Sequence, residues 1–273
     1  LVGKPNVGKS TFFAASTLIP VDIANYPFCT IEPNVGFSFI PSRQPCPCGS
    51  LRKRLEEDGR VQFSDERGGS ICSPRTGSCE GHQRYVPCML VDVAGLVPGA
   101  SQGRGRGNAF LSDLAECDAL IQVIDVAGTT DLEGNPTGVK ATKEQAIEQA
   151  LAEVEFLISE LDAWLLGLVK DGWSRGARRI QAEGVKGFIQ FLQERLSGLG
   201  ATDSICQRSF DAFAQQHSDM TSPWDWSDDV LTLLASSIRK HLFPIFVAGN
   251  KADLAPEGVL DHLRNVLPSF TPC

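Results

Sequence analysis

The chain has 273 residues, of which 42% are hydrophobic and 21% charged, and its formal net charge is −8 at pH 7. These values fit a globular protein large enough to bury a core, and they exclude a whole-body basic field for nucleic acid. No stretch approaches the roughly 20 apolar residues of a membrane span, and no signal peptide is visible. We therefore expect a cytoplasmic protein whose nine cysteines are reduced thiols or metal ligands. Because Leu1 lies just before a glycine-rich motif, we expect the N-terminus to be cut.

That motif, Gly3 to Thr11 (G-K-P-N-V-G-K-S-T), matches the phosphate-loop pattern G-x-x-x-x-G-K-[ST]. Its glycines allow the backbone to close around phosphates, and N–H groups at the start of the following helix point at the anion. Lys9 can reach the β- and γ-phosphates, and the Ser10 hydroxyl can ligate magnesium. The alternative is an ordinary glycine-rich turn. We expect the nucleotide phosphates to be held by Asn6, Val7, Gly8, Lys9, Ser10 and Thr11.

Residues 41–85 form an insertion rich in proline, glycine, serine and charge between two expected core strands. It contains four cysteines, with His82 nearby. Thiolates are soft ligands that suit tetrahedral zinc, and a loop without a core needs a cross-link. Unligated thiols are the alternative. The charged stretch Leu51–Arg60 indicates a solvated segment or a local RNA-contact patch. The zinc ligands predicted here are Cys46, Cys48, Cys72 and Cys79.

A second motif follows an apolar run from Val86 to Asp92, which predicts a buried parallel strand with an acid at its tip. Asp92 and Gly95 form an Asp-x-x-Gly motif, where many GTP-hydrolysing switches keep their magnesium aspartate. Such switches often place a glutamine next, to orient the attacking water. Leu96 occupies that position and can neither donate nor accept a hydrogen bond.

The middle of the chain predicts one more strand and then helices. Ala119–Val126 reads as a buried strand, and residues 138–240 read as a helical insertion. Apolar residues spaced three and four apart predict packed helices over 147–165, 185–196 and 230–238.

The last apolar run, Phe243 to Asp253, ends in N-K-A-D. In GTPases the aspartate of this motif accepts from the guanine ring N–H and exocyclic amine, and the lysine stem covers the base. Adenine would leave the Asp253 carboxylate unpaired, which costs about 1–3 kcal/mol or more. A helix N-cap at Asn250 or Asp253 is the alternative. Three motifs in this order predict a P-loop GTPase core, with the base held by Asn250, Lys251 and Asp253.

These motifs together resemble the Obg-related GTPases, most closely the YchF/Obg-like branch in its archaeal form. The resemblance covers most of the chain and extends through Tyr26–Gly36, Gly103–Leu111, Asp131–Thr137, Trp164–Trp173 and Pro223–Val230.

It implies an α/β fold, in which a Ras-like P-loop GTPase domain has a mostly parallel sheet flanked by helices and an inserted helical arm. We expect a GTPase domain at 1–137, a helical insertion at 138–240 and a second GTPase segment at 241–273. The family's Ser-Ala base-contacting loop and TGS domain are expected beyond Cys273.

The resemblance also assigns roles to single residues. This branch has a hydrophobic residue in place of the glutamine, as Leu96 is here, and some relatives compensate with a potassium ion held partly by a residue matching Asn6. Asn6 as an ordinary turn residue is the alternative. Thr30 is the expected switch threonine, which joins Ser10 and Asp92 at magnesium, although a plain β-forming threonine remains open. The Gly95 N–H is expected to contact the γ-phosphate.

One departure bears on the nucleotide. The best-known YchF members replace the base-reading aspartate with glutamate and accept ATP, whereas Asp253 favours GTP. We expect a switch that binds Mg-GTP, hydrolyses it slowly to GDP, and acts with the ribosome, rRNA or the translation machinery, without a membrane partner. The alternative is a nucleotide-dependent binding module that does not hydrolyse.

Overall fold

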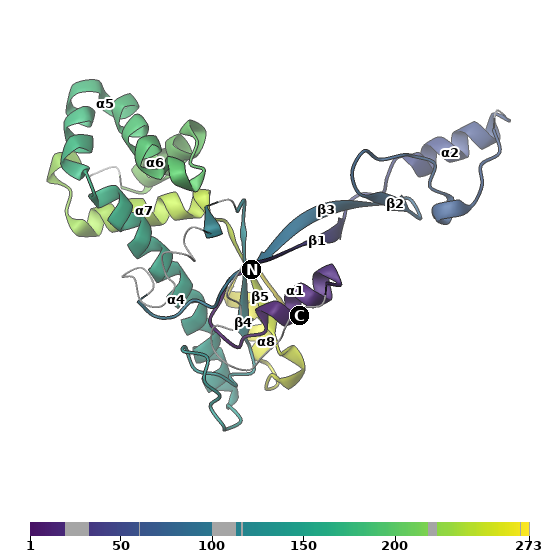
Figure 1. The fold of residues 1–273 in the computed structure, drawn as a ribbon, viewed down its shortest axis with the longest axis horizontal. Coiled ribbons are helices and arrows are strands. Elements are labelled where there is room, and N and C mark those ends of the chain that lie inside the picture. The colour runs from purple at the N-terminus through teal and green to yellow at the C-terminus, as the bar shows by residue number, and fades with distance from the viewer. Residues whose placement is uncertain are drawn as a thin grey trace. The chain divides into compact units, whose positions relative to one another are not determined.

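The computed structural model describes residues 1–19, 33–59, 61–99, 113–115, 117–217, 223–267 and 269–272 (Figure 1). The chain divides into two compact units. Unit 1 comprises Leu1–Lys9, Asp22–Pro33 and Val93–Cys273. Unit 2 comprises Ser10–Val21 and Asn34–Asp92.

The sheet of unit 1 is parallel and has the order β4-β5-β6. Its strands are β4 (Leu120–Asp125), β5 (Ile245–Asn250) and β6 (Phe270–Pro272). Five of the six β4 residues are buried, as expected for a parallel strand covered on both faces. Val2 forms a parallel bridge to Gln122 on the other side of β4, so the segment entering the phosphate loop lies beside the sheet.

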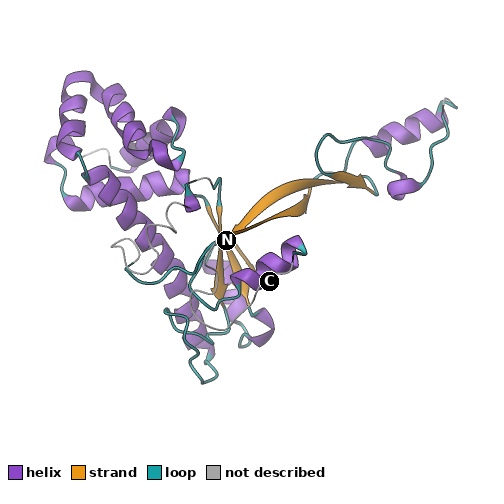
Figure 2. Cartoon of the chain, in the orientation of Figure 1, coloured by secondary structure: helices purple, strands orange, loops and turns teal. Residues whose placement is uncertain are grey.

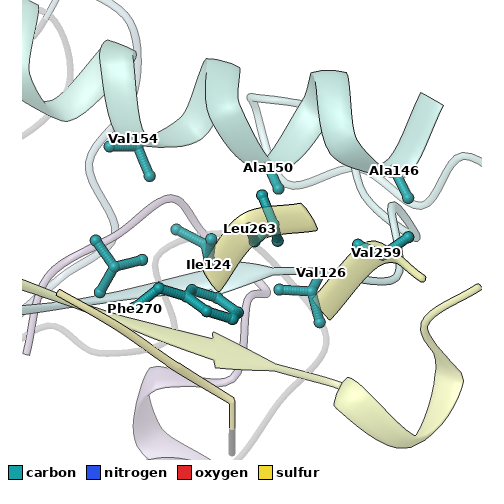
Figure 3. Close-up of a cluster of buried hydrophobic side chains, with 9 residues drawn as sticks. Ile124, Val126, Ala146, Ala150, Val154, Val259, Leu263 and Phe270 are labelled. Atoms are coloured by element: carbon teal, nitrogen blue, oxygen red, sulfur yellow. The ribbon is translucent and has the colours of Figure 1, made fainter. Parts of the chain in front are cut away.

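One face of this sheet is covered by α4 (Lys143–Lys170) and α8 (Val259–Val266). Figure 3 shows Ala146, Ala150 and Val154 of α4 directed at the buried side chains of the strands. Small residues at these positions allow the helix backbone to approach the sheet closely. The remaining members of the buried cluster are Ile124, Val126, Val247, Val259, Leu263 and Phe270.

The predicted helical insertion is confirmed, and helices make up most of unit 1 outside its sheet (Figure 2). After α4 come α5 (Trp173–Leu196), α6 (Asp203–Gln216) and α7 (Asp228–Leu242), of which α6 was not predicted. A capping box at Thr142 begins α4. Among the described residues, no helix is long and apolar enough to cross a bilayer. Short 3-10 turns occur at Glu66–Gly69, Ser197–Leu199, Pro223–Asp225 and Ala252–Leu254.

An aromatic cluster holds the helical insertion together. Phe188 of α5 is almost fully buried, and its ring lies 5.9 Å from that of Trp173 and 5.1 Å from that of Phe210. Trp226 stacks on Trp173 at 5.7 Å. Val185, expected in the same apolar stripe, is exposed. The cluster joins the first residue of α5, Trp173, to Phe188 in the C-terminal half of the helix, and aromatic rings supply a large apolar area there.

Unit 2 contains an antiparallel sheet of order β1-β3-β2. Its strands are β1 (Asn34–Pro41), β2 (Ser78–Glu80) and β3 (Gln83–Asp92), and its helix α2 spans Cys48–Glu57. Helix α1 (Lys9–Thr17) begins at the last residue of the first unit 1 segment and continues into unit 2.

The prediction that Val86–Asp92 is a buried parallel strand was wrong. These residues belong to β3, which pairs antiparallel with β1, with Asn34 opposite Asp92. Val86 and Met89 are 48% and 56% exposed. The error has a physical cause, because a short apolar run does not distinguish a strand buried on both faces from one that exposes alternate side chains.

Candidate nucleotide-binding site

The phosphate loop has the backbone conformation that its glycines predict. Gly3, Asn6 and Gly8 have positive φ angles of 144°, 59° and 95°. A Cβ atom on Gly3 would lie 2.4 Å from the Val123 carbonyl oxygen, so only glycine fits where the loop passes β4. The Lys9 Nζ donates to the Lys4 carbonyl at 2.9 Å, so its ammonium lies over the loop. In this conformation, successive backbone N–H groups of the loop can point at one bound anion.

The predicted base-reading motif contacts this loop directly. Asn250, the last residue of β5, donates its Nδ2 to the Val7 carbonyl at 2.7 Å. Lys251 has a left-handed backbone with φ 61°, and Asp253 is exposed two residues later. The structure therefore brings together two motifs separated by more than 240 residues.

Asp125 supports the base-reading motif, and the sequence analysis did not identify it. Its buried carboxylate accepts from the Lys251 Nζ at 2.9 Å and from the Thr129 hydroxyl at 2.7 Å. Burial raises the pKa of Asp125, but the hydrogen bonds from Thr129 and Lys251 outweigh it and hold the pKa below its ordinary value. The available signal was its position, an acid at the end of the apolar run that forms β4.

A buried ion pair links the phosphate loop to α4. The Lys4 Nζ lies 2.7 Å from Glu153 Oε1 and also donates to the Thr130 carbonyl at 2.7 Å. Burial raises the pKa of Glu153 to about 7, although the Lys4 ammonium opposes that shift. Glu153 Oε2 also accepts from the Asp125 N–H at 3.2 Å. This pair was not predicted, because a charged residue inside an apolar helix stripe gives no sign of its partner.

The segment after Asp92 approaches the same loop within unit 1. The Leu96 N–H donates to the Gly3 carbonyl at 3.0 Å, and the Leu96 side chain is buried. A Cβ on Gly95 would lie 2.8 Å from the Pro5 nitrogen, so the Gly95 backbone lies against the loop. The residue in the usual glutamine position is thus a packing residue.

Asn6, the candidate potassium ligand, is held by a nearby loop. Its Nδ2 donates to the Gly134 carbonyl at 2.8 Å. Its left-handed φ also agrees with the alternative interpretation of a turn residue. The Asn6 amide is oriented by its hydrogen bond to Gly134, and Asn6 can be both a turn residue and a potassium ligand.

Two predicted magnesium ligands contact each other in unit 2. The Ser10 hydroxyl donates to Asp92 Oδ2 at 2.6 Å, and Asp92 is fully buried. The other carboxylate oxygen, Asp92 Oδ1, is buried without a hydrogen-bond partner among the described residues. A buried oxygen of this kind fits a hard cation, which takes oxygen ligands. Thr11 is exposed on α1, and Thr30 lies outside the described residues, as do most of Tyr26–Gly36 and all of Gly103–Leu111.

The four predicted zinc ligands also converge, within unit 2. The Sγ atoms of Cys46, Cys48, Cys72 and Cys79 all lie within 4.8 Å of one another. Burial raises the pKa of Cys48, but hydrogen bonds from His82 and the neighbouring thiols outweigh burial and lower it to about 6. Burial and contacts with the other thiols raise the pKa of Cys72 to about 12.

The phosphate loop opens a helix, and the Asn-Lys-x-Asp motif at the end of a parallel strand is hydrogen-bonded to that loop. These two features define the class of protein as a P-loop GTPase. The predicted fold class is therefore confirmed. Comparison with known proteins agrees: the family described as 50S ribosome-binding GTPase matches residues 1–161. The chain belongs to this family.

Among curated relatives, an uncharacterized GTP-binding protein of Methanocaldococcus jannaschii is 42% identical over 254 residues, covering 93% of this chain and 56% of the relative. Obg-like ATPase 1 of Xenopus laevis is 37% identical over 59% of this chain and 35% of the relative. Ribosome-binding ATPase YchF of Mycoplasma genitalium is 41% identical over 45% of this chain and 27% of the relative. The predicted resemblance to the YchF/Obg-like branch is confirmed.

A solved structure of a GTP-binding protein is also similar to this chain. A GTP-binding protein from Pyrococcus horikoshii OT3 matches with a TM-score of 0.66 and 29% identity, covering 99% of this chain and 62% of that protein. The chain spans about half the length of the first curated relatives it matches.

Proposed function

We propose that the chain binds Mg-GTP and hydrolyses it slowly to GDP by in-line attack of water, as a switch that changes the affinity of a partner. The observation that supports this most is the Asn250 hydrogen bond to Val7. It joins the motif that selects the base to the loop that holds the phosphates, so base and phosphates bind as one ligand. The proposal concerns the GTPase domain, because the chain spans about half the length of the first curated relatives it matches.

The phosphates are proposed to contact the N–H groups of Asn6, Val7 and Gly8, then Lys9, Ser10 and Thr11. Lys9 neutralises charge on the β- and γ-phosphates, and the Gly95 N–H donates to the γ-phosphate. Gly95 suits this role because its backbone already lies against the loop. Release of that contact after hydrolysis would free the segment that follows it, which makes the protein a switch.

Magnesium is proposed to be held by Ser10, by Asp92 and by Thr30. A magnesium ion held by these residues would neutralise negative charge on the phosphates. The orphaned, buried Asp92 Oδ1 supports the assignment. Potassium beside Asn6 is proposed to supply the charge that other switches obtain from an arginine, because the buried Leu96 cannot orient water.

Guanine is proposed as the base, because Asp253 offers an acceptor pair to its ring N–H and exocyclic amine. The relatives named as ATPases, Obg-like ATPase 1 and YchF, set the competing hypothesis. A second function is a binding module with negligible turnover, which the apolar Leu96 favours. The names of the family and of YchF support the ribosome as partner.

The test is single-turnover cleavage of GTP and ATP with magnesium, in potassium and then in sodium buffer. We expect GTP cleavage that potassium stimulates, and we expect Asn6→Ala to lose the stimulation while still binding GTP. Tight GTP binding without cleavage in either salt would select the binding module. Equal use of ATP would contradict the role of Asp253. The exposed Asn265→Ala is the control, and it should behave as the unmodified chain.

A further inference from the structure

Four cysteines from separate parts of the insertion between β1 and β3 surround one point. The Cys46 and Cys72 Sγ atoms are 3.7 Å apart, and those of Cys48 and Cys79 are 3.8 Å apart. Four sulfurs at about 2.3 Å from one zinc ion have edges of about 3.8 Å in a regular tetrahedron. Both separations match that edge, and both far exceed the roughly 2.05 Å of a disulfide. All four cysteines are free thiols.

This insertion has no hydrophobic core of its own. Among the described residues from 42 to 82, the buried ones are two of the cysteines, Gly69 and Ser70. Leu51 and Val61 are 46% and 45% exposed, and Leu55, Phe63 and Ile71 are only half-buried. A segment this small cannot fix its conformation by apolar burial, and small domains of this kind use a metal or disulfides instead.

The backbone around the sulfurs is fixed by specific turns and hydrogen bonds. β2 and β3 are joined by a two-residue turn at Gly81 and His82, which both have positive φ as a type I′ turn requires. This turn returns the chain beside Cys46, whose N–H donates to the His82 carbonyl at 2.7 Å. The Ser70 hydroxyl accepts from the His82 N–H at 2.9 Å and lies 3.5 Å from the Cys79 sulfur. These contacts support the sulfurs in the manner of a second coordination shell.

We propose that Cys46, Cys48, Cys72 and Cys79 bind one Zn²⁺ ion in a closed tetrahedral site that folds the insertion between β1 and β3. Four thiolates in a closed shell select a soft or borderline cation and leave no position for substrate, so the site is structural. Binding displaces the thiol protons into solvent, and no redox step is involved. The proposal does not depend on nucleotide hydrolysis.

His82 defines the ligand set more closely. Its Nδ1 lies 3.5 Å from the Cys48 sulfur, a hydrogen-bond distance to a ligand atom. We assign it as a partner of the Cys48 thiolate, with the fourth ligand position taken by Cys72. His82→Ala should therefore keep the zinc, whereas Cys72→Ser should lose it.

The first experiment measures metal content of the whole chain, purified without added chelator, by mass spectrometry of the elements. We expect about one zinc per chain. Replacing zinc by Co²⁺ should give the intense visible bands and the sulfur-to-metal charge-transfer band of a tetrahedral tetrathiolate site. This spectrum needs no variant, so it tests the ligands even if a cysteine variant fails to fold.

The second experiment uses variants with a matched control. Cys72→Ser should lose the bound zinc, and Cys88→Ser, on β3 outside the cluster, should retain it. A chain that holds no zinc and carries Cys46–Cys72 and Cys48–Cys79 disulfides would overturn the proposal. So would iron in place of zinc, or a Cys72→Ser variant with full zinc content. GTP binding, measured separately on the same preparations, shows whether the proposed function fails independently.

Discussion

Asn250→Ala tests the contact on which the proposed function depends. The substitution removes the hydrogen bond from Asn250 Nδ2 to the Val7 carbonyl, which spans 2.7 Å. Val7 is fully buried, so its carbonyl would remain without this donor inside the protein. An unsatisfied buried polar group costs about 1–3 kcal/mol. Because a bound nucleotide requires the loop in its closed form, we expect GTP affinity to fall by about 5- to 150-fold.

The assay is isothermal titration with GTP, GDP and inosine triphosphate, which lacks the exocyclic amine of guanine. The Asn250 side chain donates to the Val7 carbonyl of the loop, and all three nucleotides use that loop, so Asn250→Ala should weaken all three by the same factor. Asp253→Asn replaces one of the two carboxylate acceptors by an NH₂ donor, so the side chain can no longer accept from both the ring N–H and the amine, and the preference for GTP over inosine triphosphate should fall. Asn265→Ala, on the exposed face of α8, should leave all three affinities unchanged.

Two results would refute this reasoning. Unchanged GTP affinity in Asn250→Ala would mean that the hydrogen bond to Val7 does not hold the loop in its binding form. A loss confined to GTP and GDP, with inosine triphosphate unaffected, would mean that Asn250 contacts the base.

Three further predictions follow from single contacts. Gly95→Ala places a Cβ 2.8 Å from the Pro5 nitrogen. Because overpacking costs about 1–3 kcal/mol, this substitution should weaken GTP binding at least 5-fold by titration. Gly167→Ala places its Cβ in open space and should leave GTP binding unchanged. Burial raises the pKa of Glu153 from 4.5 to about 7, so between these pH values the folded chain holds a proton there that the unfolded chain has lost. The free energy of unfolding therefore falls as the pH rises through this range, by up to about 1.4 kcal/mol per pH unit. Glu153→Gln should remove that slope in melting temperature between pH 5 and 7, and the exposed Glu148→Gln should keep it. Phe188→Ala should cost about 3–5 kcal/mol in denaturant unfolding, because the ring is buried among aromatic neighbours; a loss below 1 kcal/mol would contradict the packing.

Short-range patterns predicted much of the fold. The spacing of apolar residues located α4, α5 and α7, because one face of each helix must be buried. The phosphate loop was readable because its glycines and lysine act through local backbone geometry, which the structure reproduces at Gly3 and Gly8. Helix α6 was not predicted, because it has only three buried residues and they form a sparse apolar pattern: Cys206, Ser209 and Phe213.

The candidate site was predicted in its motifs but not in its supports. Asn250 and Lys251 were identified from the N-K-A-D motif alone. Their partners were not, since Val7 and Asp125 lie 243 and 126 residues away in the chain. The direction of β3 was also beyond the sequence, because an apolar run does not say which strand it pairs with.

The class of protein was predictable from the motifs alone, because phosphate and base recognition need particular residue types at fixed local spacing. The convergence of the four cysteines was also predicted from the sequence. The folded chain alone shows which other distant residues meet, namely Lys4 with Glu153 and Asn250 with Val7. The physical reason is that such contacts depend on burial and chain reversal between segments far apart in sequence. The local spacing of residues predicts neither which segments are buried together nor where the chain reverses direction.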